Sequence, residues 1–159
     1  MKRSALMLLL FVPVALAADK IGDAEKAEMK KLEGLWDEVA VEENGKVREV
    51  KKGARDARQW QFAKDRVVVT KGGAKQRDTD YQVVAADKDP KQICIYHYPD
   101  GVFTIQAYSG IYELDGDTLK ICLADPATPN KPAVMPKEFK SGKGIRVYTL
   151  KRASRESMK

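Results

Sequence analysis

The sequence has few of the side chains that enzymes use most often for catalysis and metal binding. Its 159 residues include one histidine and two cysteines. A Ser–His–acid triad would have to use His97, and no strand–turn–helix elbow is present to expose a nucleophilic serine. His97, Cys94 and Cys122 do not have the spacing of zinc ligands. We therefore predict that the protein is not an enzyme and binds neither a cofactor nor a metal ion.

A strong basic charge is also missing, as is a glycine-rich phosphate loop. The formal net charge of +6 includes Lys2 and Arg3, and falls to +4 if these two residues are removed. Nucleic-acid binding usually requires a strongly basic stripe. "KGGAK" at residues 71–75 is typical of a hairpin turn. The sequence therefore predicts no nucleic-acid partner.

Hydrophobic runs are short. The uncharged segment from Ser4 to Ala18 has 15 residues, fewer than the ~20 that span a bilayer. It follows two basic residues and ends in a small-x-small site, which is the pattern of a secretory signal peptide. We predict a signal peptide at residues 1–17, cleavage between Ala17 and Ala18, no transmembrane segment, and an exported protein, either periplasmic or secreted.

The rest of the chain is dominated by short alternating segments. Asp23–Leu32 has helix-forming composition, with Asp23 as the expected N-cap, Gly34 as the stop, and a thin apolar face of Ala24, Ala27 and Leu32. It predicts a weakly docked lead-in over residues 18–33. Eight or nine short strands then predict an all-β sandwich or barrel over residues 34–152, followed by a disordered tail at 153–159. The predicted inward aromatics are Trp36, Trp60, Phe62, Tyr81, Phe103 and Tyr112.

The clearest hairpin is "GIYELDGDTLKICLA", residues 110–124. Asp115-Gly116 suits a tight turn that would pair Tyr112 with Leu119. Apolar positions are odd around Phe103 and even around Tyr112, which predicts a β-bulge at Ser109-Gly110; the alternative is a strand buried on both faces. Cys94 and Cys122 would lie two strands apart, ~9.6 Å, and a disulfide needs less than ~7 Å. The expected state is two separate thiols.

Residues 125–144 contain four of the seven prolines, which favour an extended crossover. Such a long loop is typical of a lid or binding loop. The alternative is a crossover that closes one barrel end with Phe139 as its plug.

Several motifs together resemble a known family. They are "LEGLW" (32–36), "DPKQI" (89–93), "GIYELDGDTLKICLA" (110–124), "PKEF" (136–139) and "LKR" (150–152). The chain resembles the planctomycete–lentisphaerae paralogous domain, a family of exported lipocalin-like proteins without assigned activity. Members often carry Arg-Pro-Thr where this chain has Met135-Pro136-Lys137. The resemblance implies an antiparallel calycin-type barrel of eight or nine strands with a short N-terminal helix.

Gly34-x-Trp36 also resembles the Gly-x-Trp of lipocalins, in which the tryptophan packs across the closed barrel end under an arginine. Arg152 is the first candidate for that arginine and Arg146 the second. The residues to which we assign structural roles are Gly34, Trp36, Tyr81, Gly110, Tyr112, Asp115, Gly116, Leu119, Phe139 and Arg152.

Two functions are compatible with this sequence. The first is a non-enzymatic module that binds a small apolar ligand in the barrel. The second is a cell-envelope structural or interaction protein with a solid core and a basic patch for an anionic envelope component. That patch would comprise Lys51, Lys52, Arg55 and Arg58, within the basic segment 46–58. The same charges could instead protect an edge strand from aggregation.

Overall fold

The computed structural model describes residues 21–97, 105–128 and 134–153. Along these residues the elements are α1 (Asp23–Leu32), β1 (Gly34–Glu43), β2 (Lys46–Glu49), β3 (Arg58–Ala63), β4 (Arg66–Lys71), β5 (Ala74–Ala85), β6 (Lys91–His97), β7 (Gln106–Asp115), β8 (Thr118–Ala124) and β9 (Ile145–Arg152).

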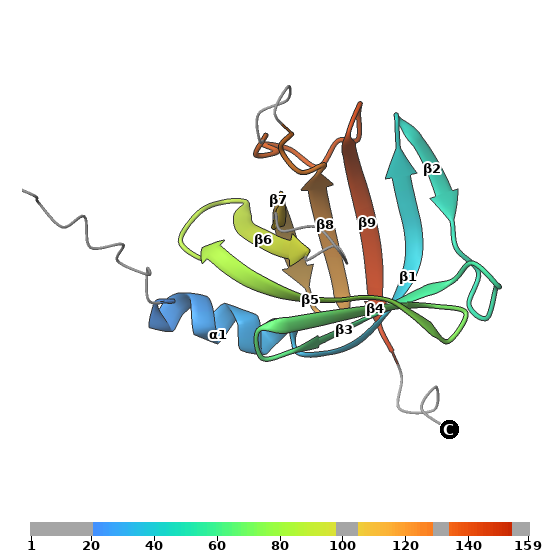
Figure 1. Cartoon of the computed structure of the whole chain (residues 1–159), viewed down its shortest axis with the longest axis horizontal. Helices are drawn as coiled ribbons and strands as arrows, with labels where there is room; N and C mark the ends of the chain where they lie inside the picture. The colour runs from blue at the N-terminus through green and yellow to red at the C-terminus, as the bar shows by residue number, and fades with distance from the viewer. Residues whose placement is uncertain (1–20, 98–104, 129–133, 154–159) are drawn as a thin grey trace, which may run out of the picture.

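The strands form one closed antiparallel barrel (Figure 1). Strands β3 to β9 follow one another in chain order, and β1 pairs with both β3 and β9 to close the circle. The short strand β2 is an extra ninth strand that pairs with the second half of β1, residues 40–43. The predicted lipocalin-like barrel with one short helix is confirmed. Closure leaves no unpaired edge among the eight strands, and the alternation of apolar and polar residues places one face of the sheet inside the barrel.

The helix α1 has the predicted bounds but is docked more firmly than its composition suggested. Gly22, not Asp23, is the N-cap residue. Ala24 and Ala27 are exposed, while Met29 and Leu32 belong to the barrel core. The expected apolar face was therefore wrong in two of its three residues. Because α1 packs against β5, it covers one end of the barrel (Figure 1).

The barrel is filled at the helix-covered end. The large side chains there are almost fully buried and share one cluster with α1: Trp36, Phe62, Tyr81, Tyr112, Leu119 and Leu150. Phe62 and Tyr81 meet edge to face with ring centroids 4.9 Å apart. Of the predicted inward aromatics, Phe103 lies outside the described residues.

The β7–β8 hairpin forms with a different turn from the one predicted. Asp115 pairs with Thr118, so the two loop residues are Gly116 and Asp117. Gly116 has φ +54°, and a glycine at the first loop position is typical of a type II′ turn. Tyr112 consequently pairs with Ile121 rather than Leu119. The shift of two residues preserves which face each side chain occupies, so both residues still face the core.

The β-bulge predicted at Ser109-Gly110 is absent. The pairing of β7 with β6 and β8 is continuous through Gly110, and the register shifts lie instead in β1, between β4 and β5, and between β5 and β6. Ile105, which the bulge would have turned inward, is 58% exposed. Ile111 is buried on the opposite face from Tyr112. The alternative interpretation, a strand buried on both faces, is the correct one here.

The outer face of this strand is covered by the late loop. Ile111, Cys122 and Val147 form a second cluster, against which Met135 and Phe139 pack. Phe139 therefore covers the outside of β7–β9 and does not plug the barrel, so that alternative was wrong.

Cys94 and Cys122 are both buried and unpaired with each other, as the strand order predicted. The predicted signal peptide at 1–17 and residues 154–159 of the predicted tail lie outside the described residues. In the part of the chain that the structure does describe, α1 is too short and too polar to cross a membrane.

Candidate functional site

The end of the barrel opposite α1 contains a cavity of about 790 Å³. Its apolar wall comes from seven strands and comprises Val41, Trp60, Val67, Val69, Ile95, Tyr108, Leu123 and Tyr148. The cavity also includes exposed residues at the tip of the β1–β2 hairpin, such as Asn44, and therefore communicates with solvent there. Its size lies in the range of pockets that bind small molecules.

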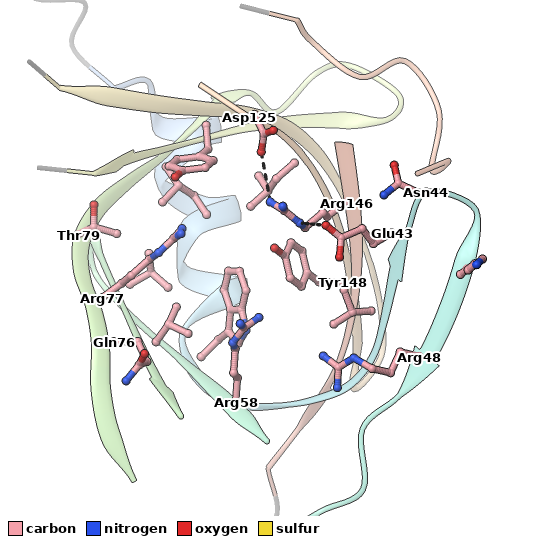
Figure 2. A pocket seen from close by; sticks show the side chains of 18 residues that line it. Glu43, Asn44, Arg48, Arg58, Gln76, Arg77, Thr79, Asp125, Arg146 and Tyr148 are labelled. Atoms are coloured by element: carbon pink, nitrogen blue, oxygen red, sulfur yellow. Dashed lines mark hydrogen bonds and ion pairs between the residues drawn. The ribbon is translucent and has the colours of Figure 1, made fainter. Parts of the chain in front are cut away.

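Arginines surround the cavity mouth at inward-facing strand positions. Arg58 precedes Trp60 by two residues, Arg77 precedes Thr79, and Arg146 precedes Tyr148. Because side chains two apart in a strand share a face, each arginine points to the same side as the cavity-lining residue two positions after it. Figure 2 shows Arg77 extending from β5 and Arg146 from β9 on opposite walls of the cavity. Lys46 and Arg48 of β2 also line it.

Most of these arginines already have carboxylate partners. Arg146 Nε lies 2.9 Å from Glu43 Oε1, and its Nη1 lies 3.2 Å from Asp125 Oδ1 (Figure 2). Arg48 Nη1 lies 2.8 Å from Asp56 Oδ2. The positive charge of Arg146 is thus neutralised within the mouth itself.

Arg77 is different, because its contact is with an aromatic ring. Its guanidinium carbon lies 5.0 Å from the centroid of Tyr108, and no carboxylate of the described residues lies within ion-pair distance of it. Two positions along β5, Thr79 is 1% exposed and lines the same cavity. The Thr79 hydroxyl has no hydrogen-bond partner among the described residues. Among the described residues, a guanidinium without a carboxylate partner and a hydroxyl without a hydrogen-bond partner therefore lie two positions apart on β5.

A buried carboxylate lies beside the cavity wall. The Glu38 side chain is fully buried, and its Oε2 accepts a hydrogen bond of 3.3 Å from Trp60 Nε1. Arg58 Nη1 is 3.9 Å from the same oxygen. Glu38 Oε1 has no partner among the described residues. Burial raises the pKa of Glu38, and the hydrogen bond from Trp60 and the charge of Arg58 only partly offset this effect.

The predicted lipocalin-type closure lies at the other end of the barrel. Arg152 lies over Trp36, with its guanidinium carbon 4.1 Å from the ring centroid. It also donates hydrogen bonds to the Glu33 and Lys31 carbonyls at the end of α1. The Trp36 indole donates to the Leu32 carbonyl at 2.9 Å. Arg146, the second candidate, lies at the cavity mouth instead.

A second buried carboxylate connects α1 to the barrel. Glu28 accepts a hydrogen bond from Tyr112 Oη at 3.2 Å and lies 2.5 Å from Lys31 Nζ and 3.1 Å from Lys91 Nζ. Burial alone would raise the pKa of Glu28, but the two lysines lower it below the usual value. This group contributes to helix docking and lies far from the cavity lining.

The predicted basic patch is divided by the fold. Lys51, Lys52 and Arg55 are exposed between β2 and β3, whereas Arg58 lines the cavity. Among the three surface residues, none contributes to the cavity wall. Of the four predicted patch residues, Arg58 is therefore the one that belongs to the cavity.

The histidine and the two cysteines do not form a metal site with other described residues. Within residues 21–97, 105–128 and 134–153, no group of His, Cys, Asp and Glu could hold a metal ion. His97 is the last residue of β6 and is partly exposed. Burial raises the pKa of both the Cys94 and the Cys122 thiols, which disfavours the reactive thiolate.

Comparison with known proteins yields no match among family models, curated proteins or solved structures. The resemblance drawn from the sequence motifs stays a prediction. The arrangement of the cavity itself is what bears on function.

Proposed function

We propose that this protein is an exported, non-enzymatic binding module that takes a small, mainly apolar ligand into its barrel. The single observation that carries the proposal is the cavity of about 790 Å³ with its apolar wall. Apolar ligands are favoured in such a site because binding removes their surface, and that of the wall, from water. A solid-core envelope protein would instead fill this half of the barrel.

The sequence motifs support the proposal of export. Residues 1–17 carry the charged, apolar and small-x-small regions of a signal peptide. N-terminal sequencing of the protein from its native host should begin at Ala18, and a chain that begins at Met1 or Lys2 would contradict export by this route.

Binding is tested with a neutral fluorescent probe and a variant that fills the cavity. Val69 faces the cavity and is 6% exposed, while its neighbour Val68 faces outward on the same strand. N-phenylnaphthylamine, which is uncharged, should bind the wild-type protein with increased fluorescence. Val69→Phe should weaken that binding at least ~10-fold, equivalent to ~1.4 kcal/mol, because the added ring occupies ligand volume.

Val68→Phe is the matched control, since it adds the same ring to the outer face. It should bind the probe like the wild type. Thermal melting of both variants shows that each is folded, because overpacking can itself destabilise a core. Absence of probe binding by the wild type, or equal weakening by both folded variants, would overturn the proposed function.

A further inference from the structure

The arginines at the cavity mouth differ in whether a carboxylate lies close enough to pair with them. Arg146 and Arg48 are engaged by carboxylates within 3.2 Å. Arg58 is 3.9 Å from the buried Glu38. Arg77 contacts only the Tyr108 ring among the interactions of the described residues. Among the described arginines that line the cavity, Arg77 is therefore the one without a carboxylate within ion-pair distance.

Thr79 supplies an independent observation beside that arginine. Its hydroxyl is buried, lines the cavity and has no partner among the described residues. Buried polar atoms are nearly always hydrogen-bonded, and an exception requires an explanation. A bound group that accepts a hydrogen bond would provide the missing partner.

We infer that the cavity selects amphipathic anions: an apolar chain in the barrel, and an oxyanion headgroup bound by the Arg77 guanidinium and the Thr79 hydroxyl. This inference rests on the proposed function and specifies its ligand class. Guanidinium binds carboxylates and phosphates through paired N–H donors. Thr79 and Arg77 share the inner face of β5, so one headgroup can contact both while its chain extends toward Val67 and Trp60.

The charge at the mouth favours the same ligand class. The described residues that line the cavity include five cations against two carboxylates, Glu43 and Asp125. The cations are Lys46, Arg48, Arg58, Arg77 and Arg146. A cationic headgroup would be repelled, and a neutral one would leave the hydrogen-bond donors of Arg77 without an ionic partner. Carboxylates and phosphate monoesters share the required chemistry.

The test compares ligands with one chain and different headgroups. In the assay, each ligand competes with bound N-phenylnaphthylamine on the full-length mature protein. The four ligands are dodecanol, dodecanoate, dodecyl phosphate and dodecyltrimethylammonium. At least one of the two anions should bind ~10-fold or more tightly than dodecanol, equivalent to ~1.4 kcal/mol, and the ammonium should bind more weakly. Which anion is preferred distinguishes a carboxylate from a phosphate headgroup. Equal binding of alcohol and both anions would overturn the inference.

Variants assign the selectivity to named groups. Arg77→Gln should remove most of the preference for anions while leaving affinity for the neutral probe within about twofold, because the apolar wall is unchanged. Arg55→Gln removes the same charge from the exposed β2–β3 loop and should retain the preference. If Arg55→Gln weakens anion binding as much as Arg77→Gln, the selectivity is a diffuse surface effect and the inference is wrong.

Thr79→Val provides a readout that a structural role would not produce. Removing an unsatisfied buried hydroxyl should leave the melting temperature of the empty protein unchanged or raise it. The same substitution should weaken anion binding several-fold and leave dodecanol binding intact. Unchanged anion binding in a folded Thr79→Val protein would exclude the hydroxyl from the headgroup site. If the wild-type protein does not bind the neutral probe at all, that result would instead contradict the proposed function itself.

Discussion

At the scale of single residues, two buried glutamates show how neighbours determine the charge state of a carboxyl. Glu28 has two lysines within 3.1 Å, which lower its pKa despite burial. Glu38 has Arg58 only at 3.9 Å and one unsatisfied oxygen, and burial raises its pKa. Glu28 therefore favours the folded state when ionised, whereas ionised Glu38 opposes it.

This difference predicts a pH-dependent effect of Glu38→Gln. Because the folded-state pKa of Glu38 lies above its usual value of 4.5, the stability it contributes is present below that value and is lost as pH rises through the folded-state pKa. Glu38→Gln should therefore raise the free energy of unfolding at pH 7 by ~1 kcal/mol. Urea denaturation of both proteins at pH 7 and pH 4 measures the difference.

The gain should shrink toward zero at the lower pH, where the wild-type carboxyl becomes protonated. Glu28 titrates in both proteins and cancels in the comparison. A variant that is less stable than the wild type at pH 7 would mean that the ionised carboxylate is compensated, and would contradict this account of Glu38.

The functional and structural residues at the two ends of the barrel differed in how well the sequence predicted them. Trp36 and Arg152 could be found because Gly-x-Trp is a short local pattern with an expected partner near the C-terminus. Arg58, Arg77 and Arg146 were missed as one group, although alternation carried the signal: each lies two residues before an inward-facing side chain. Their convergence depends on barrel closure, which brings β3, β5 and β9 to one mouth.

At the scale of elements, the β7–β8 hairpin shows which parts of a strand pattern are reliable. Inward and outward faces were predicted correctly for Tyr112 and Leu119, because any shift of two residues preserves them. The loop residues were not, since Gly116 can begin a type II′ turn as well as end a type I′ turn. The bulge was predicted because the apolar positions around Phe103 are odd and those around Tyr112 are even. In the structure Ile105 is exposed, and Ile111 is buried under the late loop, a contact that alternation within one strand cannot predict.

The two glycines of this hairpin should differ in their tolerance of a side chain. A Cβ on Gly110 would lie 2.4 Å from the Cys122 carbonyl oxygen, whereas one on Gly116 has no atom within 4 Å and only the positive φ to oppose it. We expect Gly110→Ala to cost ~3 kcal/mol of stability and Gly116→Ala ~1 kcal/mol.

Thermal or urea denaturation of the two alanine variants measures both costs under identical conditions. Probe binding by the folded fraction should be unchanged in each, because neither glycine lines the cavity. A smaller loss of stability for Gly110→Ala than for Gly116→Ala would show that β7 and β8 are not as close at this point as the structure places them.

At the scale of the whole molecule, the barrel is divided into a filled half and a hollow half. Trp36, Phe62, Tyr81 and Tyr112 occupy the end beneath α1, while valines, Trp60 and Tyr148 surround the cavity at the other end. The alternation was compatible with a sandwich or a barrel, and the family resemblance implied the barrel, but neither predicted this division. The sequence identifies which side chains face inward but not their position along the barrel axis. It therefore cannot distinguish a barrel that is filled throughout from one that is filled at one end only.

The central claim is that the hollow half binds an apolar ligand, and amide NMR of the labelled protein tests it most directly. Titration with N-phenylnaphthylamine should shift resonances of cavity-lining residues such as Val69, Ile95 and Tyr148, and leave the outer cluster of Ile111 and Val147 unchanged. Shifts confined to the outer face of β7–β9, or no saturable shifts at all, would contradict the account.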